Sequence, residues 1–282
     1  MPDATVLARL RAVRCFLLDM DGTFYLGDNL LEGSLEFLDT LRRTGRQALF
    51  LTNNSSKNAG AYVQKLERMG VREPFLRVYT SGQAAGRYVL ETFPGKRAFL
   101  LGNAFLRREL EEMGVPLDDE NPDYVLAGFD TTLTYAKLTQ VCGLIRRGLP
   151  YVATHPDFNC PTETGFIPDI GAIIAFIEAS TGRRPDIIIG KPYQGIVDGA
   201  LALTGVPAAE TAMVGDRLYT DIATGVNFGM TSILVLSGEA SLEDVEASDV
   251  KPHLIFDRLS DMIPFLDGGR GTLGGAAPRT PA

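Results

Sequence analysis

Two aspartates close a short, largely apolar segment near the start of the chain, which reads DMDGT at residues 19–23. If that segment is a β-strand, the side chains of Asp19 and Asp21 face the same way. Two like charges that close repel each other unless a cation or a shared proton relieves them, and oxygen ligands suit Mg²⁺. Gly22 and Thr23 would then turn the chain and offer backbone N–H groups and a hydroxyl to an anion. The pattern indicates phosphate chemistry beside a metal, although an acidic turn at a strand end is an alternative that the pentapeptide alone leaves open.

Three further apolar segments also end in polar residues that suit this chemistry. These residues are Thr52, Asn53, Asn54, Lys191, Asp216 and Asp221. Continuous apolar runs of this length are typical of parallel strands that are buried on both faces. In open α/β sheets the ligand lies beyond the carboxyl ends of the strands. We therefore expect the four strand ends to bring two carboxylate pairs, a hydroxyl and an ammonium group to one crevice.

The four segments together resemble the motifs of the haloacid dehalogenase superfamily of phosphatases. They read DMDGT at 19–23, LTNNS at 51–55, GKP at 190–192 and GDRLYTD at 215–221, in the family's order. A long insertion between the second and third motifs resembles the NagD-like branch, which includes phosphatases of p-nitrophenyl phosphate, sugar phosphates, phosphoglycolate and pyridoxal phosphate. The resemblance covers about residues 12 to 266. It implies an α/β fold with a doubly wound, mostly parallel sheet and an inserted α/β cap domain.

The resemblance also implies how the acidic residues divide the work. Asp19 would be the nucleophile that forms an aspartyl phosphate, and the side chain of Asp21 would be the general acid and base. The Asp19 carboxylate, the Asp21 backbone carbonyl and Asp216 would hold Mg²⁺. Asp221 would orient a metal-bound water. Spacing alone does not distinguish the nucleophile from the acid.

The other two motifs would bind the phosphoryl group. Thr52 and the backbone amides near Asn53 and Asn54 would contact its oxygens, and Lys191 would neutralise charge in the transition state. The expected partner is therefore a small-molecule phosphate ester.

The βα alternation divides the chain into segments. Residues 1–79 and 183–266 carry the motifs and are expected to form a discontinuous catalytic core. Residues 80–182 have strands and helices of their own, enough for an inserted cap domain with its own core. Residues 267–282 are rich in Gly, Ala and Pro and are expected to be a disordered tail.

Individual elements follow from the same patterns. A β-hairpin is predicted around residues 27–29. Cap strands are predicted at 98–101, 124–127 and 151–153. The strand at 186–190 is expected to return the chain to the core.

The cap must select the ester, since the core motifs contact only the phosphoryl group. Its most informative part is the non-periodic segment 154–163, which is expected to be a loop. His155 can bind a leaving group or move a proton there, or it can be a structural residue satisfied by the loop. Asp157, Asn159 and Glu163 can bind sugar hydroxyls, or they can simply be solvated loop residues.

Composition narrows the function class. The net charge of −8 argues against a nucleic-acid-binding surface. No segment resembles a transmembrane span or a signal peptide, so no membrane partner is expected. Three cysteines without ligand spacing fit a reduced cytoplasm. The oligomeric state stays open, with a homodimer as one option.

The residues are compatible with several other functions. The substrate can be phosphoglycolate, pyridoxal phosphate or a nucleotide instead of a sugar phosphate. A mutase would return the phosphoryl group to its substrate. A receiver-like module that accepts phosphate on Asp19 would need neither a cap nor the second acid, Asp21.

Overall fold

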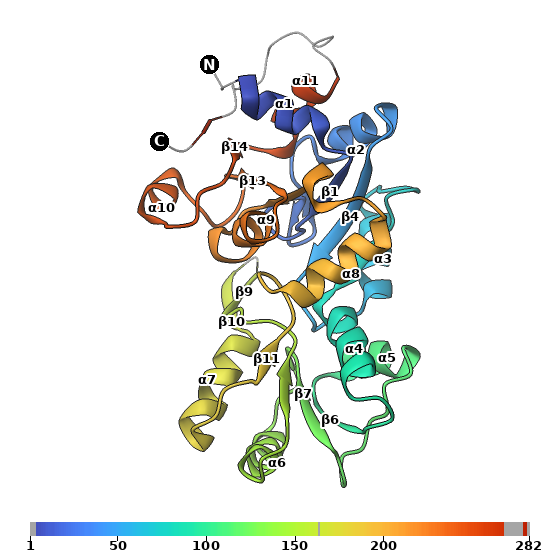
Figure 1. Cartoon of the computed structure of the whole chain (residues 1–282), viewed down its shortest axis with the longest axis vertical. Coiled ribbons are helices and arrows are strands. Elements are labelled where there is room, and N and C mark those ends of the chain that lie inside the picture. The colour runs from blue at the N-terminus through green and yellow to red at the C-terminus, as the bar shows by residue number, and fades with distance from the viewer. Residues whose placement is uncertain (1–3, 163, 268–278, 281–282) are drawn as a thin grey trace. The chain divides into compact units, whose positions relative to one another are not determined.

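A computed structural model of the chain describes residues 4–162, 164–267 and 279–280 (Figure 1). Contacts between residues divide the chain into two compact units. The first unit consists of Met1–Leu51, Val63–Val78 and Ala200–Ala282, and the second of Thr52–Tyr62 and Tyr79–Gly199.

A six-stranded sheet organises the first unit. Its strands are β1 (Cys15–Leu18), β4 (Gln47–Thr52), β5 (Val78–Thr80), β12 (Thr211–Gly215), β13 (Thr231–Val235) and β14 (Leu254–Phe256). They are ordered β14-β13-β12-β1-β4-β5. Leu18 pairs in parallel with both Val214 and Phe50, so β1 lies between β12 and β4. Every residue of β1 is buried, as expected of a central strand covered on both faces.

Helices flank this sheet. They are α1 (Ala4–Ala12), α2 (Ser34–Arg43), α9 (Ala223–Asn227), α10 (Leu242–Ala247) and α11 (Ile263–Leu266), with α3 (Ala59–Arg68) and α8 (Gln194–Thr204) shared with the second unit. Short 3₁₀ or π turns lie at η1 (Ala208–Glu210), η2 (Leu218–Ile222) and η3 (Leu259–Met262). Phe37 of α2 meets Phe16 of β1 edge to face, with ring centroids 5.4 Å apart. Helical spacing of Phe37, Leu38 and Leu41 buries one face of α2.

The predicted hairpin is confirmed. Strands β2 (Tyr25–Leu26) and β3 (Asn29–Leu30) pair antiparallel around a two-residue turn. Gly27 in that turn has φ 57°, a conformation that favours glycine.

The end of the chain returns to the sheet. Arg279 exchanges both backbone hydrogen bonds with Ile255 of β14, each 3.0 Å long. The predicted disorder of residues 267–282 falls largely on 268–278 and 281–282, which lie outside the described residues.

A four-stranded parallel sheet organises the second unit. Its strands are β6 (Ala98–Leu101), β7 (Tyr124–Ala127), β8 (Tyr151–Ala153) and β11 (Ile187–Ile188), in the order β11-β8-β7-β6. Its helices are α4 (Ser81–Thr92), α5 (Ala104–Glu112), α6 (Tyr135–Arg146) and α7 (Ile170–Thr181). Each helix begins after a polar residue whose side chain accepts a hydrogen bond from the first turn; these residues are Thr80, Asn103, Thr134 and Asp169. The three predicted cap strands are confirmed.

The strand predicted at 186–190 does not return to the core sheet. Ile187 and Ile188 pair in parallel with Val152 and Ala153 of β8, so β11 is an edge strand of the four-stranded sheet. The expectation was wrong because an apolar run suits either sheet, and its length and composition do not say which open edge it joins. The predicted boundaries of the cap at residues 80 and 182 stay a prediction.

The segment expected to be a loop includes the first strand of a second hairpin, which extends beyond it to residue 168. Strands β9 (Asn159–Thr162) and β10 (Gly165–Pro168) pair antiparallel. All residues of these two strands are at least partly exposed, so the sequence shows no clear alternation of apolar and polar residues. Glu163 lies outside the described residues. Within the described part of the chain, no helix is long and apolar enough to cross a bilayer.

Candidate active site

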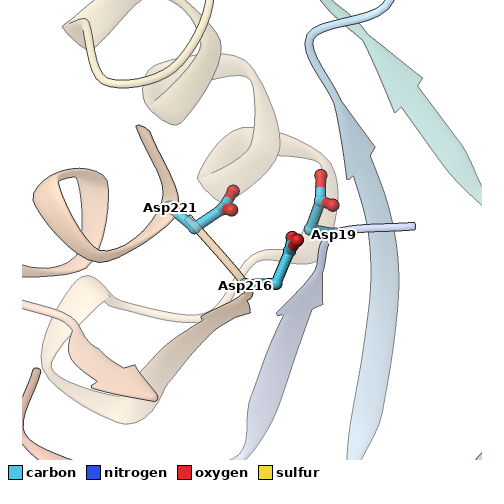
Figure 2. Close-up of side chains that lie close together, drawn as sticks. All are labelled: Asp19, Asp216 and Asp221. Carbon is cyan, nitrogen blue, oxygen red and sulfur yellow. The ribbon is translucent and has the colours of Figure 1, made fainter. Parts of the chain in front are cut away.

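Three carboxylates converge in the first unit. Asp19 follows β1, Asp216 follows β12, and Asp221 lies in η2. One oxygen from each lies within 4.8 Å of the others (Figure 2). Oxygen donors at this spacing are the ligands that a hard divalent cation prefers.

The sheet and a tight turn position these three side chains. Asp19 donates its backbone N–H to the carbonyl of Val214 at 2.9 Å, which extends the β1–β12 ladder to the first carboxylate. Asp221 accepts a hydrogen bond from the backbone N–H of Arg217 at 3.2 Å. A Cβ on Gly215 would lie 2.2 Å from Cγ of Asp221, so glycine is needed for the Asp221 carboxylate to approach the strand end.

The electrostatics of Asp216 favour a bound cation. Its residue is only 3% exposed, and burial raises the pKa of its carboxyl to about 7, with the nearby Asp221 charge as the second cause. Arg217 and the backbone N–H of Glu239, which donates to Oδ2 at 2.8 Å, act in the opposite direction. A divalent cation would compensate the buried negative charge, so the residues present fit a metal.

Gly22 and Thr23 support Asp216. Gly22 has φ 83°, and a Cβ there would lie 2.4 Å from Oδ2 of Asp216. The Thr23 hydroxyl donates to Oδ1 of Asp216 at 3.4 Å. Their backbone N–H groups, which the sequence suggested for an anion, donate within the turn to the carbonyls of Tyr25 and Met20.

The first hairpin holds Asp21. Asp21 is half-buried and forms a β-bridge with Tyr25. The Lys65 ammonium from α3 lies 3.9 Å from the centroid of the Tyr25 ring and donates to the carbonyl of Gly27 at 2.7 Å. The sequence did not indicate this link between α3 and the residue expected to be the acid.

A second polar group lies in the second unit, around the second motif. The Thr52 hydroxyl accepts a hydrogen bond from the backbone N–H of Asn54 at 3.1 Å. The Asn54 side chain accepts one from the backbone N–H of Ser56 at 2.9 Å and donates one to Sγ of Cys160 at 3.4 Å. The side chain of Asn54 therefore has partners within the protein.

Asn53 connects the second and third motifs. Its Oδ1 accepts a hydrogen bond from the backbone N–H of Lys191 at 2.7 Å, and its Nδ2 donates to the Lys191 carbonyl at 3.0 Å. Nδ2 also donates to Oδ1 of Asp157 at 3.1 Å. All three residues are buried: Asn53 is 4% exposed, Lys191 2% and Asp157 5%. Sequence reasoning missed this contact, because nothing in the local pattern links positions so far apart in the chain.

His155 is fully buried. Its Nδ1 lies 3.0 Å from Oγ1 of Thr154, and its Nε2 lies 3.0 Å from Oδ1 of Asp169. Asp169 also caps α7 through the backbone N–H of Ile170. These contacts favour the structural alternative for His155 over contact with a leaving group.

Comparisons with known proteins agree with the motifs. A family model described as haloacid dehalogenase-like hydrolase matches residues 16–116. A second model, described as HAD-hydrolase-like, matches residues 188–262. The two matches include the three carboxylates and also Thr52, Asn53 and Lys191, whereas His155 and Asp157 lie between the matched ranges.

Individual relatives match over nearly their whole length. An acid sugar phosphatase of Staphylococcus aureus (strain MRSA252) is 38% identical, with 92% of this chain and 100% of the relative covered. The structure of a 4-nitrophenylphosphatase from Thermotoga maritima has a TM-score of 0.88 and 50% identity, over 92% of this chain and 99% of that one. NagD from E. coli K-12 has a TM-score of 0.80 and 31% identity, over 88% and 97%. The chain therefore belongs to the haloacid dehalogenase-like hydrolases and is a NagD-like phosphatase that hydrolyses phosphate monoesters.

Proposed function

We propose that this phosphatase is Mg²⁺-dependent and hydrolyses small sugar or polyol phosphates through an aspartyl phosphate on Asp19. The observation that carries the proposal is the convergence of Asp19 and Asp216, which follow the paired strands β1 and β12, with Asp221 of η2. We propose sugar phosphates as the substrate class because curated relatives that match almost the whole chain are named acid sugar phosphatases.

The covalent chemistry is assigned to two residues. A carboxylate oxygen of Asp19 attacks phosphorus, the bond to the ester oxygen breaks, and the leaving alkoxide takes a proton from the side chain of Asp21. Water then attacks the phosphorus of the aspartyl phosphate and gives its proton to Asp21, which releases inorganic phosphate and restores Asp19. The β-bridge between Asp21 and Tyr25 supports this assignment because it anchors the backbone of the acid.

The metal would be held by the carboxylates of Asp19 and Asp216 and by the backbone carbonyl of Asp21. When bound, Mg²⁺ supplies positive charge that offsets the charge of the phosphoryl oxygens. Asp221 would orient a ligand water. The pKa of Asp216, raised by burial, supports the need for a cation beside it.

Thr52 and Lys191 are assigned to the transferring phosphoryl group on the basis of the family motifs. A hydroxyl and an ammonium at fixed positions stabilise charge on equatorial oxygens. The ordered partners of Lys191 within the second unit support a role that requires a defined position. Gly22, Thr23 and Asp157 have partners inside the protein, so we assign them to support of the site. We further infer a cytoplasmic enzyme from the reduced cysteine pattern.

The proposal is tested with a panel of phosphate esters and Mg²⁺, reading released phosphate. The panel contains p-nitrophenyl phosphate, sugar phosphates, phosphoglycolate, pyridoxal phosphate and nucleoside monophosphates. Asp19→Asn should lower kcat by at least about a thousandfold, as expected when a covalent nucleophile is lost. Asp249→Asn, a change at an exposed aspartate, is the matched control and should leave kcat unchanged.

Two results would contradict the proposal. If Asp19→Asn retains more than about a tenth of the wild-type kcat, Asp19 is not the nucleophile. If phosphoglycolate or pyridoxal phosphate has a higher kcat/KM than every sugar phosphate, the assigned substrate class is wrong while the phosphatase assignment stands.

A further inference from the structure

The Asn53 side chain forms hydrogen bonds with the peptide groups on both sides of the Lys191 Cα atom. One acceptor and one donor of the same amide engage the N–H and the C=O of a single residue, at 2.7 and 3.0 Å. This pairing also determines which way the amide points, because only Oδ1 can accept from the N–H and only Nδ2 can donate to the carbonyl. The backbone of Lys191 is therefore held from both sides.

The remaining hydrogen of the amide is used as well. A primary amide has two N–H hydrogens, and Nδ2 of Asn53 directs one to the Lys191 carbonyl and the other to Oδ1 of Asp157 at 3.1 Å. Asn53 cannot donate to a substrate without losing one of these bonds. Because Asn53 is only 4% exposed, such a loss would leave a buried polar group without a hydrogen bond.

The residue before Lys191 further restrains the position of the Lys191 backbone. The ladder between β11 and β8 continues through Gly190, whose backbone N–H donates to the Thr154 carbonyl at 2.7 Å. A Cβ on Gly190 would lie 2.6 Å from Oδ1 of Asn53 and 2.7 Å from Cβ of His155. The Ser81 hydroxyl donates to the Asn53 carbonyl, which fixes the backbone of Asn53 itself.

A lysine side chain needs such support if its charge is to act at one position. It has four rotatable bonds, so ordering it costs conformational entropy. A displacement of the Lys191 backbone would move its ammonium by a similar distance. Small displacements of catalytic groups are costly because charge stabilisation depends on preorganised geometry.

We propose that Asn53 and Asp157 are positioning residues for Lys191, with no direct contact to the ester. This inference rests on the proposed role of Lys191. It changes the expected role of the segment that carries His155 and Asp157: the segment determines turnover through Lys191 and does not itself recognise the sugar.

A double-mutant cycle tests the inference. Asn53→Ala, Lys191→Met and the double variant are compared with the full-length enzyme, using kcat on p-nitrophenyl phosphate and the dissociation constant of vanadate. Asn53→Ala should lower kcat by about 10- to 100-fold and leave KM within about threefold when Lys191 is present. In the Lys191→Met background the same change should alter kcat by less than about twofold, since residues that act as a unit are not additive.

Two controls separate positioning from general stability. Asn103→Ala removes another buried asparagine of the second unit, one that caps α5, and should lower the melting temperature while leaving kcat unchanged. Asp157→Ala should lower kcat less than Asn53→Ala does, and this loss should also vanish in the Lys191→Met background. If Asn53→Ala fails to fold, Asp157→Ala is tested by the same criterion.

The outcomes identify which idea fails. Wild-type kcat in Lys191→Met would overturn the proposed role of Lys191. An impaired Lys191→Met in which Asn53→Ala or Asp157→Ala still causes its full loss would overturn the inference alone. A loss confined to sugar esters and absent with p-nitrophenyl phosphate would show that these residues recognise the sugar directly.

Discussion

At the residue scale, Gly22 and Asp216 constrain each other. Gly22 has φ 83°, and a Cβ there would lie 2.4 Å from an oxygen of Asp216. Gly45 has a similar φ of 70°, but nothing lies within 4 Å of its Cβ position. The two glycines therefore separate the cost of a left-handed backbone from the cost of a collision with the acidic cluster.

We expect Gly22→Ala to weaken Mg²⁺ binding at least tenfold and to lower kcat accordingly, because Asp216 must move. Gly45→Ala should cost about 1–2 kcal/mol of unfolding free energy from its backbone conformation and leave Mg²⁺ affinity unchanged. Urea denaturation and Mg²⁺ titration measure the two quantities. Equal Mg²⁺ affinities for the two variants would show that the cluster tolerates the added methyl group.

The raised pKa of Asp216 makes metal binding depend on pH. Burial raises this pKa above its unfolded value near 3.9, so the folded protein without metal binds a proton that the unfolded chain releases. This contribution to stability is complete below about pH 4 and is lost as the pH rises through about 7. Mg²⁺ must displace this proton, so the affinity for Mg²⁺ increases as the pH rises over the same range.

The increase in melting temperature on adding Mg²⁺ should therefore be larger at pH 8 than at pH 5. Thermal unfolding with Mg²⁺ or with a chelator, at both values, measures it. In Asp216→Asn the dependence on pH should be much smaller. An equal increase at both pH values in the wild-type protein would mean that the proton on Asp216 does not compete with the metal.

The sequence predicted that the Asp19 and Asp216 side chains would lie close together, because each residue follows the end of a strand. Asp19 and Asp216 directly follow apolar runs, and paired parallel strands carry both to one edge of the sheet. The partners of Asn53 and His155 could not be predicted in this way. Their hydrogen bonds depend on side-chain packing between segments that no periodicity connects.

At the element scale, Lys65 joins α3 to the first hairpin through the Tyr25 ring and the Gly27 carbonyl. Lys65→Met keeps most of the stem but loses the charge, and it should cost about 1–2 kcal/mol of unfolding free energy. Lys57→Met is the matched control, because Lys57 is exposed and lies 6.0 Å from the centroid of the Tyr62 ring. Urea denaturation should show a loss below about 0.5 kcal/mol for that control.

Lys65→Met should also affect kcat through Asp21. Because Asp21 bridges to Tyr25, a loosened hairpin should lower kcat more for alkyl phosphates, which need a proton on the leaving oxygen, than for p-nitrophenyl phosphate. A uniform loss across both ester types would separate Lys65 from the acid.

Elements with strong local signals were predicted from the sequence, and the assignment of edge strands was not. The strands β6, β7 and β8 follow from short apolar runs in the sequence. The position of β11 could not be predicted, because the sequence does not say which sheet has an open edge for it. The β9–β10 hairpin could not be predicted either, because its exposed residues show no alternation of apolar and polar side chains.

At the scale of the whole molecule, the second unit contains more than the segment first assigned to the cap. Thr52–Tyr62 and the stretch through Gly199 belong to it by their contacts. Replacing residues 80–182 with a short Gly/Ser linker would leave the acidic cluster with all its first-unit partners. The same change would remove β8 beside β11 and Asp157 beside Asn53.

We therefore expect the shortened protein to be stabilised by Mg²⁺ but to lose phosphatase activity even on p-nitrophenyl phosphate. Circular dichroism, thermal unfolding with Mg²⁺, and phosphate release measure folding, metal binding and turnover. A folded, shortened protein that keeps more than about a tenth of wild-type kcat would show that Lys191 acts without those contacts.

The return of Arg279 to β14 has a consequence for how the protein behaves at high concentration. An outermost strand with unpaired backbone groups is a template on which another molecule can add a strand, and β14 is short and apolar. Arg279 occupies both hydrogen bonds of Ile255 and places a guanidinium 3.1 Å from the Asp257 carboxylate. A protein that ended at Asp267 would expose this edge and should be more prone to aggregate, with no change in its catalytic residues.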